Sequence, residues 1–219
     1  MRTLEEAALE ASTCTKCGLA ESRTQVVYGV GSPTAELLFI GEGPGFHEDK
    51  QGEPFVGAAG QLLNRMLDGI GLERSDVYIA NVVKCRPPGN RDPRPAEIEA
   101  CTPYLREQID LIDPRVVVTL GNWATRFILD KPELSISRVR GGKFPWNGRI
   151  VIPTFHPAAI LHGGGENSRQ FQALQQDFEI VKKTLAERPQ PAAAANARAG
   201  APSSAAAAGG PDEDQLELF

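Results

Sequence analysis

The sequence has no hydrophobic run long enough to cross a lipid bilayer, and its acidic start, MRTLEEAALEAS, has no apolar signal core. We therefore expect a cytoplasmic protein with no membrane partner, in a compartment where thiols stay reduced. An excess of basic residues is also absent, because 23 Lys and Arg stand against 28 Asp and Glu. Over the whole chain, this balance argues against a strongly basic nucleic-acid-binding protein.

The acidic charge is concentrated near the end of the chain. Residues 189–219 hold one basic and four acidic residues, and residues 1–188 hold 22 basic and 24 acidic ones. Ala, Pro, Gly and Ser dominate residues 189–211, and such a composition cannot build a hydrophobic core. We expect a near-neutral folded domain over 1–188 and a disordered tail over 189–219.

Short apolar runs predict the strands of the folded domain. They are almost continuously hydrophobic, which is typical of strands buried on both faces, and they span residues 36–40, 77–82, 115–120 and 150–155. Segments with helical periodicity lie between or after them, at residues 60–70, 95–112, 122–129 and beyond 168. The alternation predicts an α/β fold, a three-layer αβα sandwich around a four-stranded parallel sheet. Ligands of such sheets bind at the carboxyl ends of the strands.

Four residues should define the ends of these helices. Gly71 can end the first helix, and Asn122 and Ser168 can cap the amino ends of two others. Pro103 should break or kink the helix predicted over 95–112, because proline lacks the backbone N–H that a helix interior needs.

Four cysteines form the first candidate site: Cys14 and Cys17 in a C-x-x-C pair, then Cys85 and Cys101. In a reducing compartment they indicate metal or cluster ligands rather than two disulfides. Four thiolates suit tetrahedral zinc or a [4Fe–4S] cluster, and the spacing alone does not choose between them. Unrelated buried thiols are the third interpretation.

A glycine-rich turn, Gly-Glu-Gly-Pro-Gly at residues 41–45, follows the first predicted strand. Its glycines permit a tight turn and close approach to a ligand, although an ordinary structural turn is the simpler interpretation. The turn is not a phosphate-binding P-loop, because the GK[ST] ending is missing. Glu42, at the carboxyl end of a strand, is the better functional candidate, whereas Glu48 and Asp49 could lie on a solvated face.

Three ordered motifs then give a specific resemblance. GEGPGFHEDKQGEPFVGAAGQ at 41–61, NVVKCRPP at 81–88 and FHPA at 155–158 resemble those of the family-4 uracil-DNA glycosylases. The four cysteines fall at the four ligand positions of that family, so the resemblance implies a [4Fe–4S] cluster instead of zinc. It covers about residues 1–188.

The resemblance implies an enzyme that flips uracil out of DNA and hydrolyses its N-glycosidic bond, leaving an abasic site for base excision repair. Phe55 would stack on the base, and the Asn81 amide would pair with uracil O4 and N3–H. Glu48 would help to exclude the 5-methyl group of thymine, and Gly41 and Gly43 would complete the uracil-binding turn.

Two residues are the catalytic candidates. His156 would donate to uracil O2 and stabilise the departing anion. Better-known uracil glycosylases carry an Asp where this sequence has Gly43, so leaving-group stabilisation should dominate. We expect Glu42, one residue earlier, to position water or to stabilise the oxocarbenium-like sugar.

Local basic residues offer contacts to the DNA backbone. Lys84, Arg86, Arg91 and Arg94 surround Cys85 and are predicted to neutralise phosphates, although they could be ordinary solvated loop charges. Leu161 could wedge into the gap that the flipped base leaves.

The last five residues, QLELF, resemble the peptide by which bacterial replication and repair proteins bind the polymerase sliding clamp. Gln215 would make polar contacts there, and Leu216, Leu218 and Phe219 would enter an apolar cleft. We expect a monomer associated with the bacterial nucleoid. The alternatives are a catalytically inactive nucleic-acid-binding iron–sulfur module of the same fold and a redox iron–sulfur protein.

Overall fold

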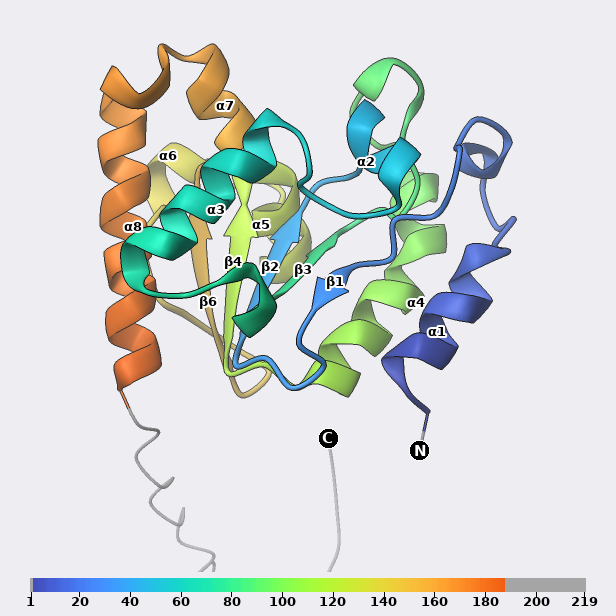
Figure 1. The fold of residues 1–219 in the computed structure, drawn as a ribbon, viewed down its shortest axis with the longest axis horizontal. Coiled ribbons are helices and arrows are strands. Elements are labelled where there is room, and N and C mark those ends of the chain that lie inside the picture. The colour runs from blue at the N-terminus through green and yellow to red at the C-terminus, as the bar shows by residue number, and fades with distance from the viewer. Residues whose placement is uncertain (1, 188–219) are drawn as a thin grey trace, which may run out of the picture. The chain divides into compact units, whose positions relative to one another are not determined.

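In the computed structural model, which describes residues 2–187, a six-stranded sheet forms the centre of the protein (Figure 1). The strand order is β1-β3-β2-β4-β6-β5. The four inner strands are parallel neighbours: β3 (Tyr78–Asn81), β2 (Leu37–Gly41), β4 (Val116–Leu120) and β6 (Arg149–Thr154). All four lie where the apolar runs predict them.

The predicted sheet of four strands is too small. Two antiparallel strands complete its edges, β1 (Val30–Gly31) beside β3 and β5 (Phe144–Trp146) beside β6. They have two and three residues, which is too short for a hydrophobic period to show in the sequence.

Helices cover both faces of the sheet (Figure 1). The α-helices are α1 (Leu4–Ser12), α2 (Phe46–Gln51), α3 (Ala58–Ile70), α4 (Pro95–Ile112), α5 (Gly121–Leu129), α6 (Ile136–Val139), α7 (Pro157–His162) and α8 (Arg169–Ala186). Single 3₁₀ turns lie at Gly18–Glu21, Arg74–Asp76, Pro88–Asn90 and Gly165–Asn167. Among these residues, no helix is both long and apolar enough to span a membrane.

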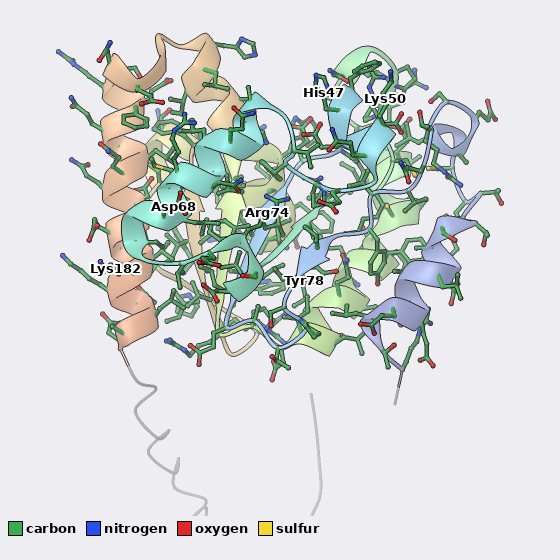
Figure 2. The ribbon with its side chains drawn as sticks, viewed as in Figure 1. His47, Lys50, Asp68, Arg74, Tyr78 and Lys182 are labelled. Atoms are coloured by element: carbon green, nitrogen blue, oxygen red, sulfur yellow. The ribbon has the colours of Figure 1, made fainter. Side chains whose placement is uncertain are left out.

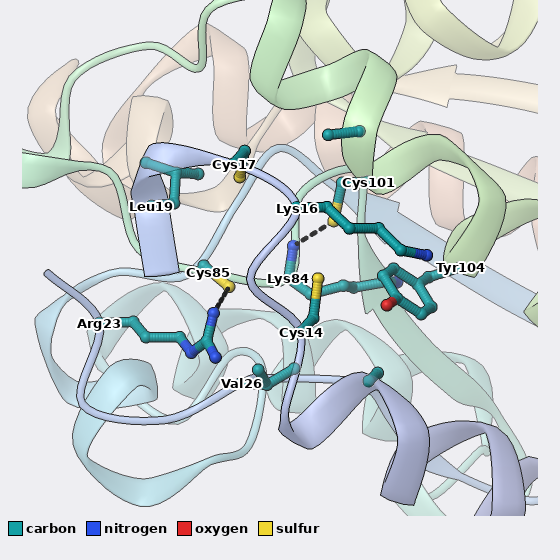
Figure 3. A pocket seen from close by; sticks show the side chains of 12 residues that line it. Cys14, Lys16, Cys17, Leu19, Arg23, Val26, Lys84, Cys85, Cys101 and Tyr104 are labelled. Carbon is teal, nitrogen blue, oxygen red and sulfur yellow. Dashed lines mark hydrogen bonds between the residues drawn. The ribbon is translucent and has the colours of Figure 1, made fainter. Parts of the chain in front are cut away.

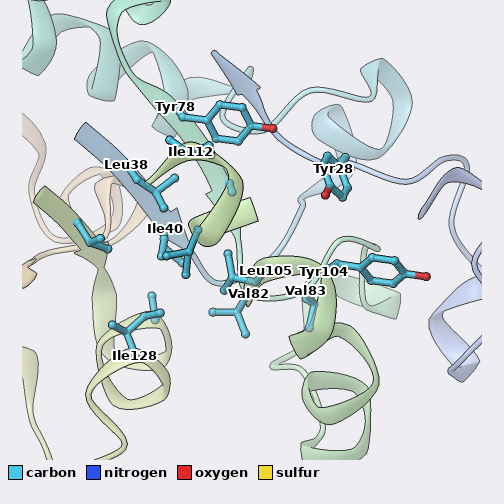
Figure 4. Packing of buried hydrophobic residues seen from close by; sticks show 14 of the residues in the cluster. Tyr28, Leu38, Ile40, Tyr78, Val82, Val83, Tyr104, Leu105, Ile112 and Ile128 are labelled. Carbon is cyan, nitrogen blue, oxygen red and sulfur yellow. The ribbon is translucent and has the colours of Figure 1, made fainter. Parts of the chain in front are cut away.

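Successive residues of β2 divide the core into two layers. Leu38 and Ile40 belong to a cluster with residues of α1, α4 and α5, part of which Figure 4 shows. Leu37 and Phe39 belong to a second cluster with residues of α3, α7 and α8. Because side chains alternate across a strand, the sheet is covered on both faces. Polar side chains point outward, as Asp68 on α3 and Lys182 on α8 do in Figure 2.

Of the four residues predicted to end, cap or break helices, two act as predicted and two do not. The Ser168 hydroxyl accepts a hydrogen bond from Phe171 N at 3.1 Å, and Gly71 ends α3 with a φ of 79°. Asn122 does not cap α5: it lies inside the helix, and its Oδ1 accepts from Ile136 N at 2.9 Å. Nor does Pro103 break α4, which runs unbroken through it, because buried side chains beyond the proline pack that half against the sheet.

The predictions for the tail lie outside the described residues. They concern its composition-based disorder over 189–219 and the clamp peptide with Gln215, Leu216, Leu218 and Phe219.

Candidate functional site

The carboxyl ends of three inner strands, β2, β3 and β6, meet along one cleft of about 410 Å³. Glu42 follows β2, Asn81 ends β3 and His156 follows β6; the β2–β3 register pairs Gly41 with Asn81. Parallel pairing therefore brings residues distant in sequence to the same edge of the sheet. The cleft is lined by seven of the predicted residues: Glu42, Gly43, Glu48, Phe55, Asn81, Arg91 and His156.

Phe55 forms an aromatic wall of this cleft. The side chain is buried, and its ring centroid lies 5.5 Å from that of His156. Its backbone adopts the left-handed conformation, with φ of 55°, which is costly for a residue other than glycine. Gly60 accommodates this conformation, since a Cβ there would overlap the Phe55 carbonyl.

The loop around Phe55 is held from two sides. The Arg74 guanidinium donates to Pro54 O, to Phe55 O at 3.3 Å and to Asn64 Oδ1 at 3.3 Å. Glu48 Oε1 accepts from the next two backbone N–H groups, Val56 at 3.0 Å and Gly57 at 3.1 Å. Arg74 was not among the predicted site residues, because an arginine in a loop gives no signal of what it will contact.

Glu48 thus anchors the loop behind the aromatic wall. Its predicted exclusion of the thymine methyl group stays a prediction, since the contacts of Oε1 are with backbone amides.

Asn81 presents an unpartnered acceptor. The residue is 2% exposed, and its Oδ1 has no hydrogen-bond partner among the described residues. Because a buried, unsatisfied amide oxygen is unfavourable, it indicates that a donor on a ligand completes the site. Gly41 is the matching small residue: a Cβ there would stand 2.7 Å from the Phe55 ring and closer still to Asn81 Oδ1.

His156 is set up as a neutral hydrogen-bond donor. Its Nδ1 accepts from Ala158 N at 3.2 Å, which leaves the proton of the neutral ring on Nε2. Burial lowers the pKa of His156 to about 4, although Glu48 partly opposes this. The imidazole is therefore uncharged near neutral pH, with one N–H to offer.

Glu42 is a carboxyl group whose charge is easily removed. Burial raises its pKa to about 7, and repulsion from Asp92 adds to the shift. Asp92 also lines the cleft and was not among the predicted site residues. Its position in a Pro- and Arg-rich loop gives no periodic signal that places it opposite Glu42.

The four cysteines line a second pocket (Figure 3). Cys14 and Cys17 come from the segment after α1, Cys85 from the loop after β3 and Cys101 from α4. Among residues 2–187, no three cysteine, histidine or acidic side chains lie close enough to hold a single metal ion.

Two donors point at the cysteine sulfurs. Lys84 N donates to Cys101 Sγ at 3.2 Å, and Arg23 Nη1 donates to Cys85 Sγ at 3.5 Å (Figure 3). Burial raises the pKa of the Cys85 thiol to about 11, and the nearby Arg23 partly opposes this. Converging thiols and N–H donors fit a group that takes its ligands as thiolates and leaves negative charge on sulfur.

The prediction that Lys84 contacts DNA is wrong. The side chain is 1% exposed, and its Nζ donates to Asn81 O at 2.9 Å and to Gln108 Oε1. The Tyr28 ring lies 5.6 Å from the same Nζ. Lys84 is therefore a structural residue between the cysteine pocket and the cleft.

The other predicted DNA contacts differ in accessibility. Arg94 is exposed and Arg86 is half-buried; Arg91 is held by Glu97, with N–O distances of 2.6 and 2.9 Å. Leu161, on α7, is 38% exposed. These four stay predictions.

Comparisons with known proteins agree with this arrangement. The model of the Uracil DNA glycosylase superfamily matches residues 28–179. The type-4 uracil-DNA glycosylase of Sulfurisphaera tokodaii is 48% identical over 191 residues, 84% of this chain and 85% of that protein. The enzyme of the same name from Archaeoglobus fulgidus is 49% identical over 169 residues, 74% of this chain and 85% of that protein. The type-4 uracil-DNA glycosylase of Thermotoga maritima is 47% identical over 173 residues, 78% of this chain and 89% of that protein. With its cleft, its motifs and these relatives, the chain belongs to the uracil-DNA glycosylase superfamily.

Proposed function

We propose that the protein is a monofunctional glycosylase that flips uracil out of DNA and hydrolyses its N-glycosidic bond, leaving an abasic site for repair. The observation that carries this proposal is the buried, unpartnered Oδ1 of Asn81 at the base of an aromatic-walled cleft. Uracil N3–H is a donor that would complete it, and the Asn81 amide N–H can donate to uracil O4.

The site would promote cleavage of the N-glycosidic bond by stabilising the leaving group, uracil. As the bond to the sugar breaks, negative charge develops on the uracil ring, and Nε2–H of a neutral His156 can stabilise it at O2. A neutral donor suits this step, because the histidine need not lose a proton before or after bond cleavage.

Glu42 is suited to act on the sugar, the other product of bond cleavage. The sugar becomes oxocarbenium-like as the bond breaks, and an ionised Glu42 can stabilise that charge or orient the attacking water. Since its pKa is about 7, the carboxylate becomes the main form only above neutral pH. This role predicts that excision becomes faster as pH rises from 6 to 8.

The test uses purified protein and an oligonucleotide with a single uracil, with alkali cleaving abasic products. We expect cleavage at uracil and none at cytosine or thymine. Asn81→Asp should weaken recognition of uracil, because the carboxylate lacks the amide N–H that would donate to uracil O4. Asn147→Asp, in the exposed turn between β5 and β6, is the matched control. A cluster-bearing protein that leaves uracil in place would contradict the enzyme and favour the inactive nucleic-acid-binding module.

A [4Fe–4S] cluster on Cys14, Cys17, Cys85 and Cys101 is part of the proposal. It would serve as a structural staple that joins the amino-terminal segment to α4 and to the loop after β3. The four cysteines line one pocket from three separate segments, which supports a group held by four thiolates, each bound to a different iron. Iron and sulfide analysis of the purified protein should give four of each, and Cys101→Ser should lower both.

The remaining proposals concern partners. The QLELF peptide would tether the enzyme to the sliding clamp in the bacterial cytoplasm, at the nucleoid, and the protein would act as a monomer. Deleting residues 211–219 should abolish clamp binding while excision from short oligonucleotides stays unchanged. Unchanged clamp affinity would refute the tether, and sedimentation would test the monomer.

A further inference from the structure

Helix α2 presents an exposed aromatic side chain at the rim of the cleft. Phe46 is 44% exposed, and among the described residues only Leu9 and Leu161 are other large hydrophobic side chains with comparable exposure. Gly45 immediately precedes Phe46 and lines the cleft, as does Glu48 one residue beyond His47. A single exposed phenyl ring needs no explanation by itself, so the groups around it decide whether it can bind a ligand.

The two faces of α2 have different tasks. Glu48 holds the Phe55 loop, and the buried Asp49 accepts from Thr24 N at 2.9 Å through Oδ1. These contacts fix the inner face of the helix. Phe46, His47 and Lys50 are all exposed, and Figure 2 shows His47 and Lys50 at the outer end of the protein on α2.

Positive charge surrounds the Phe46 ring. Lys50 Nζ lies 4.5 Å from the ring centroid and the Arg86 guanidinium carbon lies 5.1 Å from it. The Arg86 Nε–H donates to Asn90 Oδ1 at 2.7 Å, and Asn90 itself lines the cleft. The patch therefore combines a ring that is 44% exposed with two flexible cations over it, and Asn90 joins it to the cleft. A base would stack on the part of the ring that these cations leave open.

Such a combination matches the chemistry of a nucleotide. An aromatic ring stacks on a base, and neighbouring cations neutralise its phosphate. An acidic peptide would need only the cations, and an apolar partner would be disfavoured by them. A base can stack on Phe46 only if one face of the base is not already stacked on a neighbour. This is the case beside a flipped nucleotide and in single-stranded DNA.

We infer that Phe46, with Lys50 and Arg86, forms a stacking platform for a nucleobase next to the flipped uracil on the same DNA strand. This inference rests on the proposed function. It assigns Phe46 a part in holding the strand and none in breaking the glycosidic bond.

A thermodynamic cycle on single-stranded DNA tests the platform. The probe carries 2′-fluoro-2′-deoxyuridine, whose fluorine opposes oxocarbenium formation and so slows cleavage, and binding is measured by fluorescence anisotropy. Phe46→Ala should weaken binding about tenfold, as loss of base–aromatic stacking does. Phe46→Trp should restore it. Leu9→Ala, which removes an exposed apolar side chain on α1, is the matched control and should change nothing.

The second arm of the cycle removes the base instead of the ring. Probes with a tetrahydrofuran residue 5′ or 3′ to the uracil analogue lack one neighbouring base. At one of these positions, Phe46→Ala and base removal should each weaken binding, and together they should do no more than either alone. Additive losses at both positions, or unchanged binding by Phe46→Ala, would overturn the platform. Uracil excision by the unmodified protein is measured separately, so failure of the enzyme function would be recognised as such.

Discussion

Replacing Arg74 with Met should impair uracil excision although Arg74 lies behind the wall of the cleft. Its guanidinium holds the carbonyl groups of Pro54 and of Phe55, and the backbone of Phe55 is left-handed. Methionine fills a similar volume but donates no hydrogen bond. Phe55 should then relax toward a negative φ, which would turn its ring out of the stacking position.

The magnitude follows from the hydrogen bonds that this substitution removes. Hydrogen bonds from a charged donor contribute roughly 1.5–3 kcal/mol each, and water would replace part of that at a half-buried site. A left-handed residue other than glycine costs about 1–3 kcal/mol, which the released loop recovers. We expect unfolding free energy to fall by only about 2 kcal/mol. The loss of stacking, about 1–3 kcal/mol, should lower kcat/KM about 5- to 160-fold.

The assay compares kcat/KM and urea unfolding in four variants. Phe55→Ala sets the full cost of removing the ring, and the double variant Arg74→Met/Phe55→Ala should be no worse. Arg65→Met is the control, because its ion pair to Glu166 at 2.7 Å is exposed and should contribute little. If Arg74→Met kept kcat/KM within twofold, or if the two losses added, the positioning role would be refuted.

Three further results are expected. Glu42→Gln should raise Tm at pH 8 and not at pH 5. The pKa of Glu42 is raised to about 7 in the folded protein, so its ionisation destabilises the fold as pH rises above about 4.5. Equal changes in Tm at both pH values would count against this. Lys84→Met should destabilise the protein and leave the salt dependence of DNA binding unchanged, whereas Arg94→Met should reduce the log–log slope by about 0.9, the value of one phosphate contact. Ser168→Ala should cost about 1 kcal/mol in urea unfolding, and a Thr variant should keep most of that stability.

The inner strands and the main helices could be predicted because each has a strong local pattern. Residues 37–40, 78–81, 116–120 and 150–154 are apolar almost without interruption. The cleft could be predicted too, since parallel strands place their carboxyl ends together and the polar residues follow those ends. The edge strands β1 and β5 could not, because two or three residues carry no period.

Two predictions of helix boundaries are wrong because a tertiary contact outweighs the local preference of the residue. Asn122 is a good capping residue, but its amide is engaged by Ile136 N from another helix. Pro103 disfavours a helix interior locally, yet Tyr104, Leu105 and Ile109 are buried against the sheet beyond it. Such contacts involve residues far apart in sequence, so propensity alone could not decide them.

Lys84 shows why charge must be located and not only counted. In sequence it belongs to a basic group around Cys85, but its ammonium group is buried under Tyr28 and Gln108. There it holds the carbonyl of Asn81 while its own backbone N–H donates to Cys101 Sγ. One residue thus connects the cysteine pocket to the backbone of Asn81, whose side-chain amide should read uracil. Because both ends of this connection are direct hydrogen bonds in a buried place, displacement of Cys101 should be felt at Asn81. A structural cluster would then matter for base recognition without touching the base.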